Sequence, residues 1–237
     1  MNIIEKAIAI QANLDIVTPG ERLTIEPRFL FITGKNAMNV IREFIELGYK
    51  KVLNPSRAIF TSETDTPFSE LSKMKNFCDE HGVSLLEKGE IYTIDAMDGK
   101  YSNLQGYVVA GIDSFIGRFG AQGAIPLLVT LRAMADCLGT GKVELAVPEM
   151  VYIEVDGALN AGVTAEKMCS YLLDYFNDSL AGYGIIIGGK TVEQLDETGR
   201  RVLARFIYES GATLGIISSG GPFGQVESVM KIDARSI

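Results

Sequence analysis

The chain has little of several residue types on which protein chemistry often depends. It contains no tryptophan, a single histidine, His81, and three cysteines among 237 residues. Cys78, Cys137 and Cys169 are odd in number and widely separated, so they predict neither a disulfide framework nor a closely spaced metal-ligand motif. We expect each of them to be a small buried residue on a helix. The sequence therefore predicts no metal site.

The chain also lacks the features of nucleic-acid-binding and membrane proteins. Its formal net charge is -8 and it has no basic run, whereas phosphate binding needs clustered Lys and Arg. The longest apolar runs, 125–129 and 184–188, are far shorter than the roughly 18–20 residues of a membrane span. The start, Met1–Lys6, lacks the layout of a signal peptide. We expect a cytoplasmic protein without nucleic-acid or membrane partners.

What is present is an alternation of apolar strands and amphipathic helices. Helices are expected over 2–12, from Asn36 to 47, from Thr66 to 81, over 121–138, from Thr164 to 176, and as a pair within 191–209, where Thr191 and Gln194 resemble a capping box. Strands are expected over 29–32, 58–61, 83–86, 91–94, 107–111, 151–155, 183–187 and 214–217.

This alternation predicts an α/β fold, a three-layer α/β/α architecture with a mostly parallel sheet. At this length and with 47% hydrophobic residues, the chain can bury a substantial core. We expect residues 1–220 to form the α/β/α unit, either as one domain or as two packed lobes. Residues 221–237 are expected to form a tail, and the chain is expected to fray after Ser219.

The strongest candidate site follows the expected strand 107–111. Asp113 and Ser114 come at its carboxyl end, where open α/β sheets place ligands. A carboxylate and a hydroxyl there predict a catalytic pair, with Asp113 as a general base. The alternative is turn chemistry, in which both side chains only bond local backbone N–H groups. Arg118, in the glycine-rich turn that follows, either clamps a substrate carboxylate or lies on the surface.

Further candidates follow other strands. Glu63 is a second candidate catalytic carboxylate and Asp65 a candidate substrate-binding residue, unless both only form an exposed acidic loop. Ser218 and Ser219 begin a glycine-rich segment whose N–H groups could receive an anion, and they are secondary candidates for substrate binding.

Four segments of the chain resemble, in the same order, the aconitase and 3-isopropylmalate dehydratase large-subunit family. The turn Asp113-Ser114-Phe115 is similar to the family's Gly-Asp-Ser-His-Thr turn. The other matching segments are Ile4–Ala9 with Val17–Glu21, Ile153–Gly157 with Gly162–Lys167, and Gly199–Arg201 with Glu209–Gly215. The matches cover roughly residues 1–220 and stop where the family's cluster-bearing half would begin. The resemblance implies the fold of the family's amino-terminal α/β/α domains.

The resemblance also implies that parts of the family's chemistry are missing. Family members eliminate and re-add water with a four-iron cluster held by three cysteines, two of them in a Cys-x-x-Cys motif. Cluster irons need thiolates at fixed spacing, and this chain has no such motif. The family histidine of the turn is Phe115 here, and the family's Asp-His pair corresponds to 62–67, which contains no histidine. We therefore expect no cofactor.

Three hypotheses for function remain open at this point. In the first, the protein is a degenerate relative that binds a small carboxylate or a partner chain. In the second, it is a cluster-independent hydro-lyase or isomerase that uses Asp113 and Glu63. In the third, it is one half of a split dehydratase whose cysteines lie on another polypeptide. We also expect a homo-oligomer or a second subunit, with Gly120–Leu128 and Leu214–Phe223 as the candidate contact surfaces.

Overall fold

The computed structural model describes the whole chain except residues 64, 87–103, 178, 219 and 222–223. The helices are α1 (Ile3–Ala12), α2 (Gly34–Glu46), α3 (Phe68–His81), α5 (Leu131–Thr140), α6 (Ala165–Phe176), α7 (Lys190–Glu193) and α8 (Glu197–Glu209), with the 3-10 segments η1 (Pro55–Arg57), η3 (Ser114–Gln122) and η4 (Ala234–Ser236). The strands are β1 (Arg22–Ile25), β2 (Phe29–Ile32), β3 (Ala58–Thr61), β4 (Ser84–Leu86), β5 (Val108–Gly111), β6 (Ile125–Leu128), β7 (Val143–Ala146), β8 (Met150–Asp156), β9 (Gly184–Gly188), β10 (Leu214–Ile217) and β11 (Ser228–Asp233).

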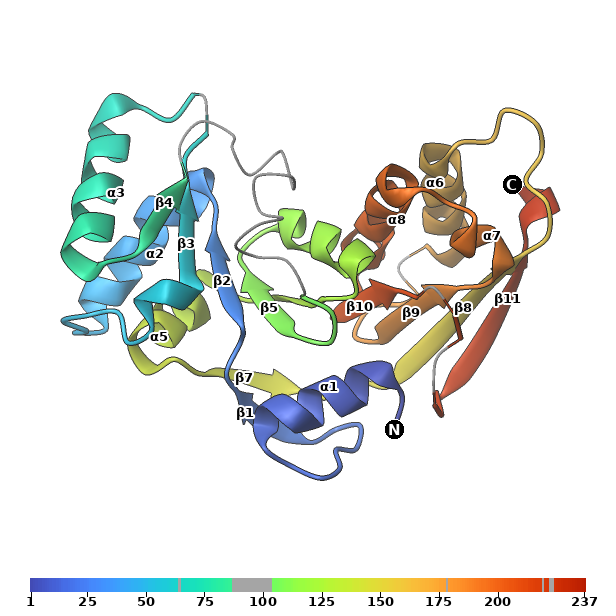
Figure 1. Ribbon diagram of the computed structural model, residues 1–237, viewed down its shortest axis with the longest axis horizontal. Coiled ribbons are helices and arrows are strands. Elements are labelled where there is room, and N and C mark those ends of the chain that lie inside the picture. Colours follow the sequence, from blue (N-terminus) through green and yellow to red (C-terminus); the bar gives the residue numbers. More distant parts are fainter. Residues whose placement is uncertain (64, 87–103, 178, 219, 222–223) are drawn as a thin grey trace.

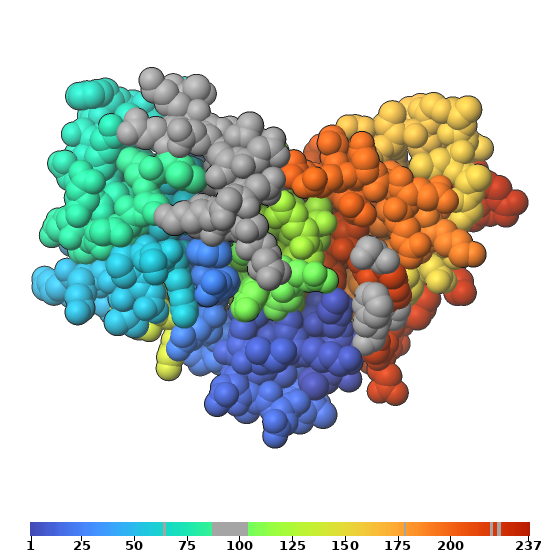
Figure 2. Space-filling model, in the orientation of Figure 1, coloured from blue at the N-terminus to red at the C-terminus, as the bar shows by residue number. Residues whose placement is uncertain are grey.

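Nine of these strands form one sheet, in the order β11-β8-β9-β10-β6-β5-β2-β3-β4. All neighbouring strands are parallel except β10 and β6, which meet antiparallel at Leu214 and Leu127. The sheet therefore consists of two parallel halves that point in opposite directions. We call β4-β3-β2-β5-β6 the first half and β10-β9-β8-β11 the second half. Figure 1 shows the two halves side by side, and in Figure 2 the N-terminal segment lies below and between them.

Alternating side chains divide the core into layers. In β2, Leu30 and Ile32 pack in a cluster with α2, α3 and α5, whereas Phe29 and Phe31 pack in a separate cluster with residues of η3. In the second half, the cluster on one face joins β8, β9 and β10 to α6 and α8. The sheet thus has helical segments on both faces, and the expected α/β architecture with a mostly parallel sheet is confirmed.

The expected continuous helix over 121–138 is wrong. This segment contains the end of η3, the strand β6 and the start of α5. Gly123 has a φ of 77°, which ends η3 in a conformation that glycine adopts readily. Pro126 follows within three residues and disfavours a helix because it has no N–H to donate. The helix resumes only after Thr130, whose hydroxyl accepts from the Ala133 N–H and caps α5.

Other local predictions differ from the structure in smaller ways. The expected capping box at Thr191 is absent, because α7 begins at Lys190 and the Thr191 hydroxyl donates to the Gly157 carbonyl. Helix α2 starts before the expected cap, Asn36, and α3 starts after Thr66. Thr164 caps α6 as predicted. The expected strand 91–94 lies outside the described residues.

Two pairings were not predicted from the sequence. β1 and β7 form a separate antiparallel pair. The segment expected to fray contains β11, which pairs with β8 over six positions. A single-sequence pattern does not reveal such pairings, because β11 is exposed along most of its length and lacks a buried alternation. Among the described residues, no helix combines the length and apolarity that a membrane crossing requires.

Candidate functional site

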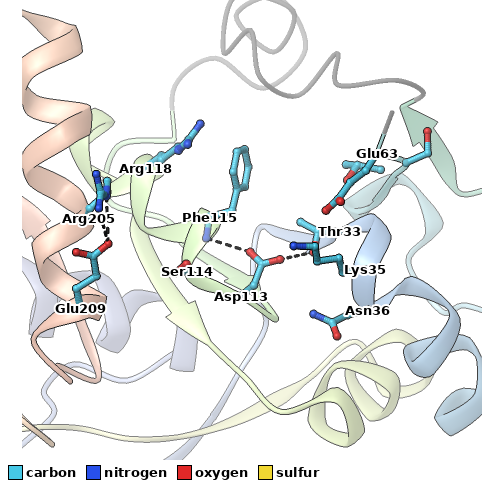
Figure 3. A pocket seen from close by; sticks show the side chains of 12 residues that line it. Thr33, Lys35, Asn36, Glu63, Asp113, Ser114, Phe115, Arg118, Arg205 and Glu209 are labelled. Carbon is cyan, nitrogen blue, oxygen red and sulfur yellow. Dashed lines mark hydrogen bonds and ion pairs between the residues drawn. The ribbon is translucent and has the colours of Figure 1, made fainter. Parts of the chain in front are cut away.

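A cavity of about 320 Å³ opens at the carboxyl ends of β2, β3 and β5. The N-terminus of α2, the segment after β3, the N-terminus of η3 and one side of α8 contribute to its wall (Figure 3). Its lining residues are Thr33, Lys35, Asn36, Thr61, Ser62, Glu63, Asp113, Ser114, Phe115, Arg118, Arg205 and Glu209. The cavity therefore lies between the strand ends of the first half and helix α8, which precedes β10 of the second half.

Asp113 occupies the centre of this site and makes two hydrogen bonds. Its Oδ1 accepts from the Phe115 backbone N–H at 3.0 Å, so that Asp113 caps η3. Its Oδ2 accepts from the Thr33 hydroxyl at the end of β2. The carboxylate thus ties two neighbouring parallel strands together at their ends. Both oxygens are engaged: the bond to Phe115 is the turn chemistry that the sequence left open for this residue, and the bond to Thr33 joins two distant segments.

The N-terminus of α2 faces the same cavity without a side-chain cap. The Thr33 hydroxyl donates to Asp113 and makes no cap hydrogen bond to α2. Lys35 and Asn36, in the first turn of α2, both line the cavity. Helix N-termini carry partial positive charge and unpaired N–H groups, so this end favours an anion. Lys35 adds a full positive charge beside it.

Gly34 sets the distance between α2 and the segment after β3. A Cβ on Gly34 would lie 3.0 Å from the Glu63 nitrogen and 3.2 Å from the Thr61 carbonyl oxygen. Only glycine permits this approach without a shift of the neighbouring backbone. The close packing brings Glu63 to the cavity beside the first turn of α2.

Arg118 and Phe115 form a stacked pair in the wall. The guanidinium carbon of Arg118 lies 4.9 Å from the centre of the Phe115 ring. The Phe115 ring meets Phe119 edge to face at 6.1 Å, and Phe119 stacks on Phe31 of β2 at 4.5 Å. This aromatic row anchors Phe115 to the core, and a cation–π contact of this kind holds an arginine in one orientation.

Helix α8 supplies an ion pair that the sequence analysis missed. Arg205 and Glu209 line the cavity, and the Arg205 Nη2 lies 2.9 Å from the Glu209 Oε1 (Figure 3). Their i,i+4 spacing signals a helical ion pair. The packing of α8 beside η3 is a tertiary contact that the local sequence does not reveal. Gly117 of η3 lies so close to α8 that a Cβ on it would be 2.7 Å from the ring of Tyr208. The sequence analysis also did not predict Lys35 of α2 as a site residue.

The structure brings some of the predicted site residues together and separates others. Glu63, Asp113, Ser114 and Arg118 line one cavity. Asp65 is exposed and is not part of the lining. Ser218 follows β10, which is antiparallel to β6. The carboxyl end of β10, and Ser218 with it, therefore lies at the opposite end of the strands from the cavity. Its hydroxyl donates to the Gly221 carbonyl at 3.0 Å. Ser219 lies outside the described residues.

The cysteines do not form a set that fits an iron–sulfur cluster. Cys78, Cys137 and Cys169 are buried on α3, α5 and α6, and none lines the cavity. Burial raises the pKa of Cys78 and of Cys137 to about 12, and burial also raises the pKa of Cys169. Cluster ligation requires thiolates that converge on the iron. Within the described part of the chain, no group of three or more His, Cys, Asp or Glu could hold a metal ion.

Comparison with known proteins identifies the class to which this fold and site belong. The model of the aconitase family (aconitate hydratase) matches residues 48–221. The chain belongs to the aconitase family.

Individual relatives agree with this assignment. The large subunit 1 of 3-isopropylmalate dehydratase from Pyrococcus furiosus is 27% identical over 92% of this chain and 53% of its own length. The 3-isopropylmalate dehydratase large subunit of Elusimicrobium minutum is 30% identical over 83% of this chain and 54% of its own length. A mitochondrial homoaconitase of Cryptococcus neoformans is 27% identical over 84% of this chain and 28% of its own length. The chain spans about half the length of the curated dehydratase relatives that it matches.

A solved structure shows the same fold. Aconitase X of Thermococcus kodakaraensis, in its holo form, superposes with a TM-score of 0.52 over 98% of this chain and 63% of its own, at 13% identity. The similarity confirms the expected aconitase-like fold.

Proposed function

We propose that this chain is a divergent aconitase-family protein that binds a small carboxylate in the cavity beside Asp113, without iron–sulfur chemistry of its own. The observation that carries the proposal is the orientation of Arg118, whose guanidinium is stacked on Phe115 at 4.9 Å in the cavity wall. A planar guanidinium held in one orientation suits bidentate recognition of a carboxylate.

The other charged groups of the cavity support the same assignment. Lys35 and the uncapped start of α2 add positive potential on the side opposite Arg118 (Figure 3). Of the three carboxylates in the lining, Asp113 is bound to Thr33 and Phe115, and Glu209 is paired with Arg205. Glu63 is therefore the carboxylate placed to accept a hydrogen bond from a ligand hydroxyl. A small hydroxy acid would meet these groups.

The proposal includes the expectation that this chain holds no iron–sulfur cluster. The three buried cysteines lie on separate helices with raised pKa values, and Phe115 stands where the family turn has a histidine. We expect the purified protein to contain no iron. Anaerobic incubation with iron and sulfide should produce no stable visible absorption, and about four irons per chain would contradict the proposal.

A second candidate function is a cluster-independent hydro-lyase or isomerase. Glu63 as general base and the exposed Ser114 hydroxyl as hydrogen-bond donor favour it, since both line the cavity. Asp113 is less suited to act as the base, because its two oxygens already accept hydrogen bonds. Formation of an unsaturated acid from 3-isopropylmalate by the isolated chain, lost in Glu63→Gln, would establish this function.

A third candidate is one half of a split dehydratase. A cavity at the strand ends, in a chain whose described residues include no group of side chains that could hold a metal, favours it. Here a second polypeptide carries the cluster cysteines. Co-purification of a chain with a Cys-x-x-Cys motif, together with iron in the complex, would establish this function in place of the first.

Calorimetric titration of the isolated chain tests the main proposal. The ligands are 3-isopropylmalate and aconitate, with sodium chloride at matched ionic strength as the control. Saturable binding of at least one acid, weakened by Arg118→Ala, is the expected result. No saturable heat from either acid, or binding that Arg118→Ala leaves unchanged, would overturn the proposal.

A further inference from the structure

The outer edge of the second half of the sheet is open. β11 is the last strand on that side and pairs only with β8 among the described strands (Figure 1). Three consecutive residues in its middle, Val229, Met230 and Lys231, are exposed. Val229 is 51% and Met230 is 38% exposed. An open edge of six residues with exposed apolar side chains is a template for pairing with another strand.

The backbone of β11 presents its free groups in a defined pattern. The Gly184 N–H of β9 donates to the Glu149 carbonyl at 2.8 Å, next to the Met150–Gly184 pair. In a parallel ladder alternate residues direct their N–H and C=O to the same neighbour. The odd-numbered residues of β8 therefore bond β9, and the even-numbered residues bond β11. Because Ser228 lies opposite Val151, the even-numbered residues of β11 face β8, and Val229, Lys231 and Asp233 direct their backbone groups outward.

We propose that β11 is a dimerisation edge that pairs antiparallel with β11 of a second copy of this chain. A twofold axis reuses one edge and joins the two nine-stranded sheets into one. The outward groups of the two copies form a ladder only where outward residues oppose outward residues. This condition limits the twofold registers to those centred on a single residue.

Charge selects one of these registers. A dimer centred on Val229 places Glu227 opposite Lys231 twice and pairs Ser228 with Met230. A dimer centred on Lys231 places two lysines opposite each other. A dimer centred on Met230 places Glu227 opposite Asp233. A dimer centred on Ile232 would place Lys231 opposite Asp233, but it joins only three residues of each strand because η4 begins at Ala234, and Asp233 is already paired with Arg235. Like charges directly opposite are unfavourable and opposite charges are favourable, so the register centred on Val229 is the one that charge and strand length support.

The intramolecular contacts of Lys231 agree with this register. Its Nζ lies 3.1 Å from Glu154 of β8 and remains largely exposed. Glu227 is exposed as well. In the dimer, each lysine would lie between Glu154 of its own chain and Glu227 of the other copy, on one face of the joined sheet.

Two kinds of variant test the proposal, with mass measured by light scattering and by sedimentation over a concentration series. The wild-type chain is expected to reach twice its mass of 25.7 kDa. Lys231→Glu and Glu227→Lys should each weaken the dimer by about 10-fold or more, and the double exchange should restore it, because only the double exchange returns opposite charges to the register. Lys167→Glu, an exposed charge reversal on α6, is the matched control and should have no effect.

Val229→Pro tests the backbone part of the proposal. The Val229 N–H points outward, so proline there removes no bond of the β8 ladder and edge strands tolerate it. The variant should keep its circular dichroism and remain monomeric. A wild-type chain that stays at 25.7 kDa up to high micromolar concentration would overturn the proposal. A dimer that survives Val229→Pro, or that the double charge exchange fails to restore, would also overturn it.

Discussion

The two parallel halves of the sheet close their carboxyl ends in different ways. In the first half the ends of β2, β3 and β5 border a cavity that contains Lys35, Glu63 and Arg118. In the second half the corresponding turns hydrogen-bond within themselves or to one another. There the Lys190 N–H donates to Asp156, and the Gly220 N–H donates to the Ser218 hydroxyl.

This difference underlies the proposal that the first half binds a ligand and the second half does not. Both halves carry acidic, hydroxyl and basic residues after their strands, so residue type alone does not distinguish them. In the second half, hydrogen bonds within a turn or between two neighbouring turns occupy the polar groups of Asp156, Thr191 and Ser218. In the first half the oxygens of Asp113 also accept hydrogen bonds within the protein. Charged residues on α2, η3 and α8 line the same cavity.

The largest expected effect compares a cation from each half. Arg118→Ala should weaken binding of 3-isopropylmalate by about 10–100-fold, because a charge-assisted hydrogen bond contributes roughly 1.5–3 kcal/mol. Lys190→Ala, at an exposed position after β9, should leave the affinity unchanged. Calorimetric titration of both variants gives the ratio. Equal losses in the two variants would remove the distinction between the halves.

The next effect compares the two capping aspartates. Asp113→Ala should lower the free energy of unfolding by about 2 kcal/mol, since it leaves partly buried donors of Thr33 and Phe115 unpaired. Asp156→Ala should lower it by about 1 kcal/mol, because the freed Lys190 N–H is exposed. Urea unfolding of each variant measures both values.

Asp113→Asn is the control for this comparison, because it keeps one acceptor and should lose less than Asp113→Ala. If Asp113→Ala retains full stability while catalysis or binding is lost, Asp113 serves the ligand and not the turn.

A smaller effect is expected at the stacked aromatic ring. Phe115→Leu removes the cation–π contact with Arg118, which contributes about 0.5–1 kcal/mol. Binding of the carboxylate should weaken by about 2–5-fold, because Arg118 must then be ordered by the ligand. Phe68→Leu, at an 85% exposed position outside the cavity, is the matched control. Unchanged affinity in Phe115→Leu would show that Arg118 needs no support from the ring.

The smallest effect at neutral pH concerns two buried thiols that pack against the first half. Burial raises the pKa of Cys78 and of Cys137 to about 12, above the unfolded value of about 9. A raised pKa means that the unfolded chain loses its proton first. The thiols therefore leave stability unchanged below about pH 8 and lower it progressively from about pH 9 toward pH 12. Unfolding midpoints across this range measure the decline.

The cysteine prediction has its own control. Cys78→Ala should flatten the decline, whatever its effect at pH 7. Alkylation of the native protein at pH 8 should be slow and should become fast in urea. Rapid alkylation of Cys78 or Cys137 in the folded protein would show that these thiols are accessible and suited to ligation after all.

The sequence by itself determined much of the fold. Short apolar runs such as 29–32, 58–61 and 214–217 become β2, β3 and β10, because a fully buried parallel strand must be apolar on both faces. The resemblance around Asp113-Ser114 correctly gave the family. The position of Asp113 and Ser114 after a strand also placed them at the cavity.

Tertiary structure decided the rest, since the missing information lay in contacts between distant segments. The antiparallel contact of β10 with β6 carries Ser218 away from the cavity, although its sequence resembles an anion-binding loop. The same contact buries Leu214–Ile217 and most of β6 inside the sheet, so these parts of the two segments expected as contact surfaces are internal.

The packing of α8 against η3 brings Arg205 and Glu209 into the same cavity as Asp113, although they lie more than 90 residues from it in the sequence. No local pattern encodes this proximity. Periodicity and turn chemistry report on neighbours along the chain. Strand order, strand direction and helix docking depend on how the whole core packs, and they decide which polar residues share a cavity.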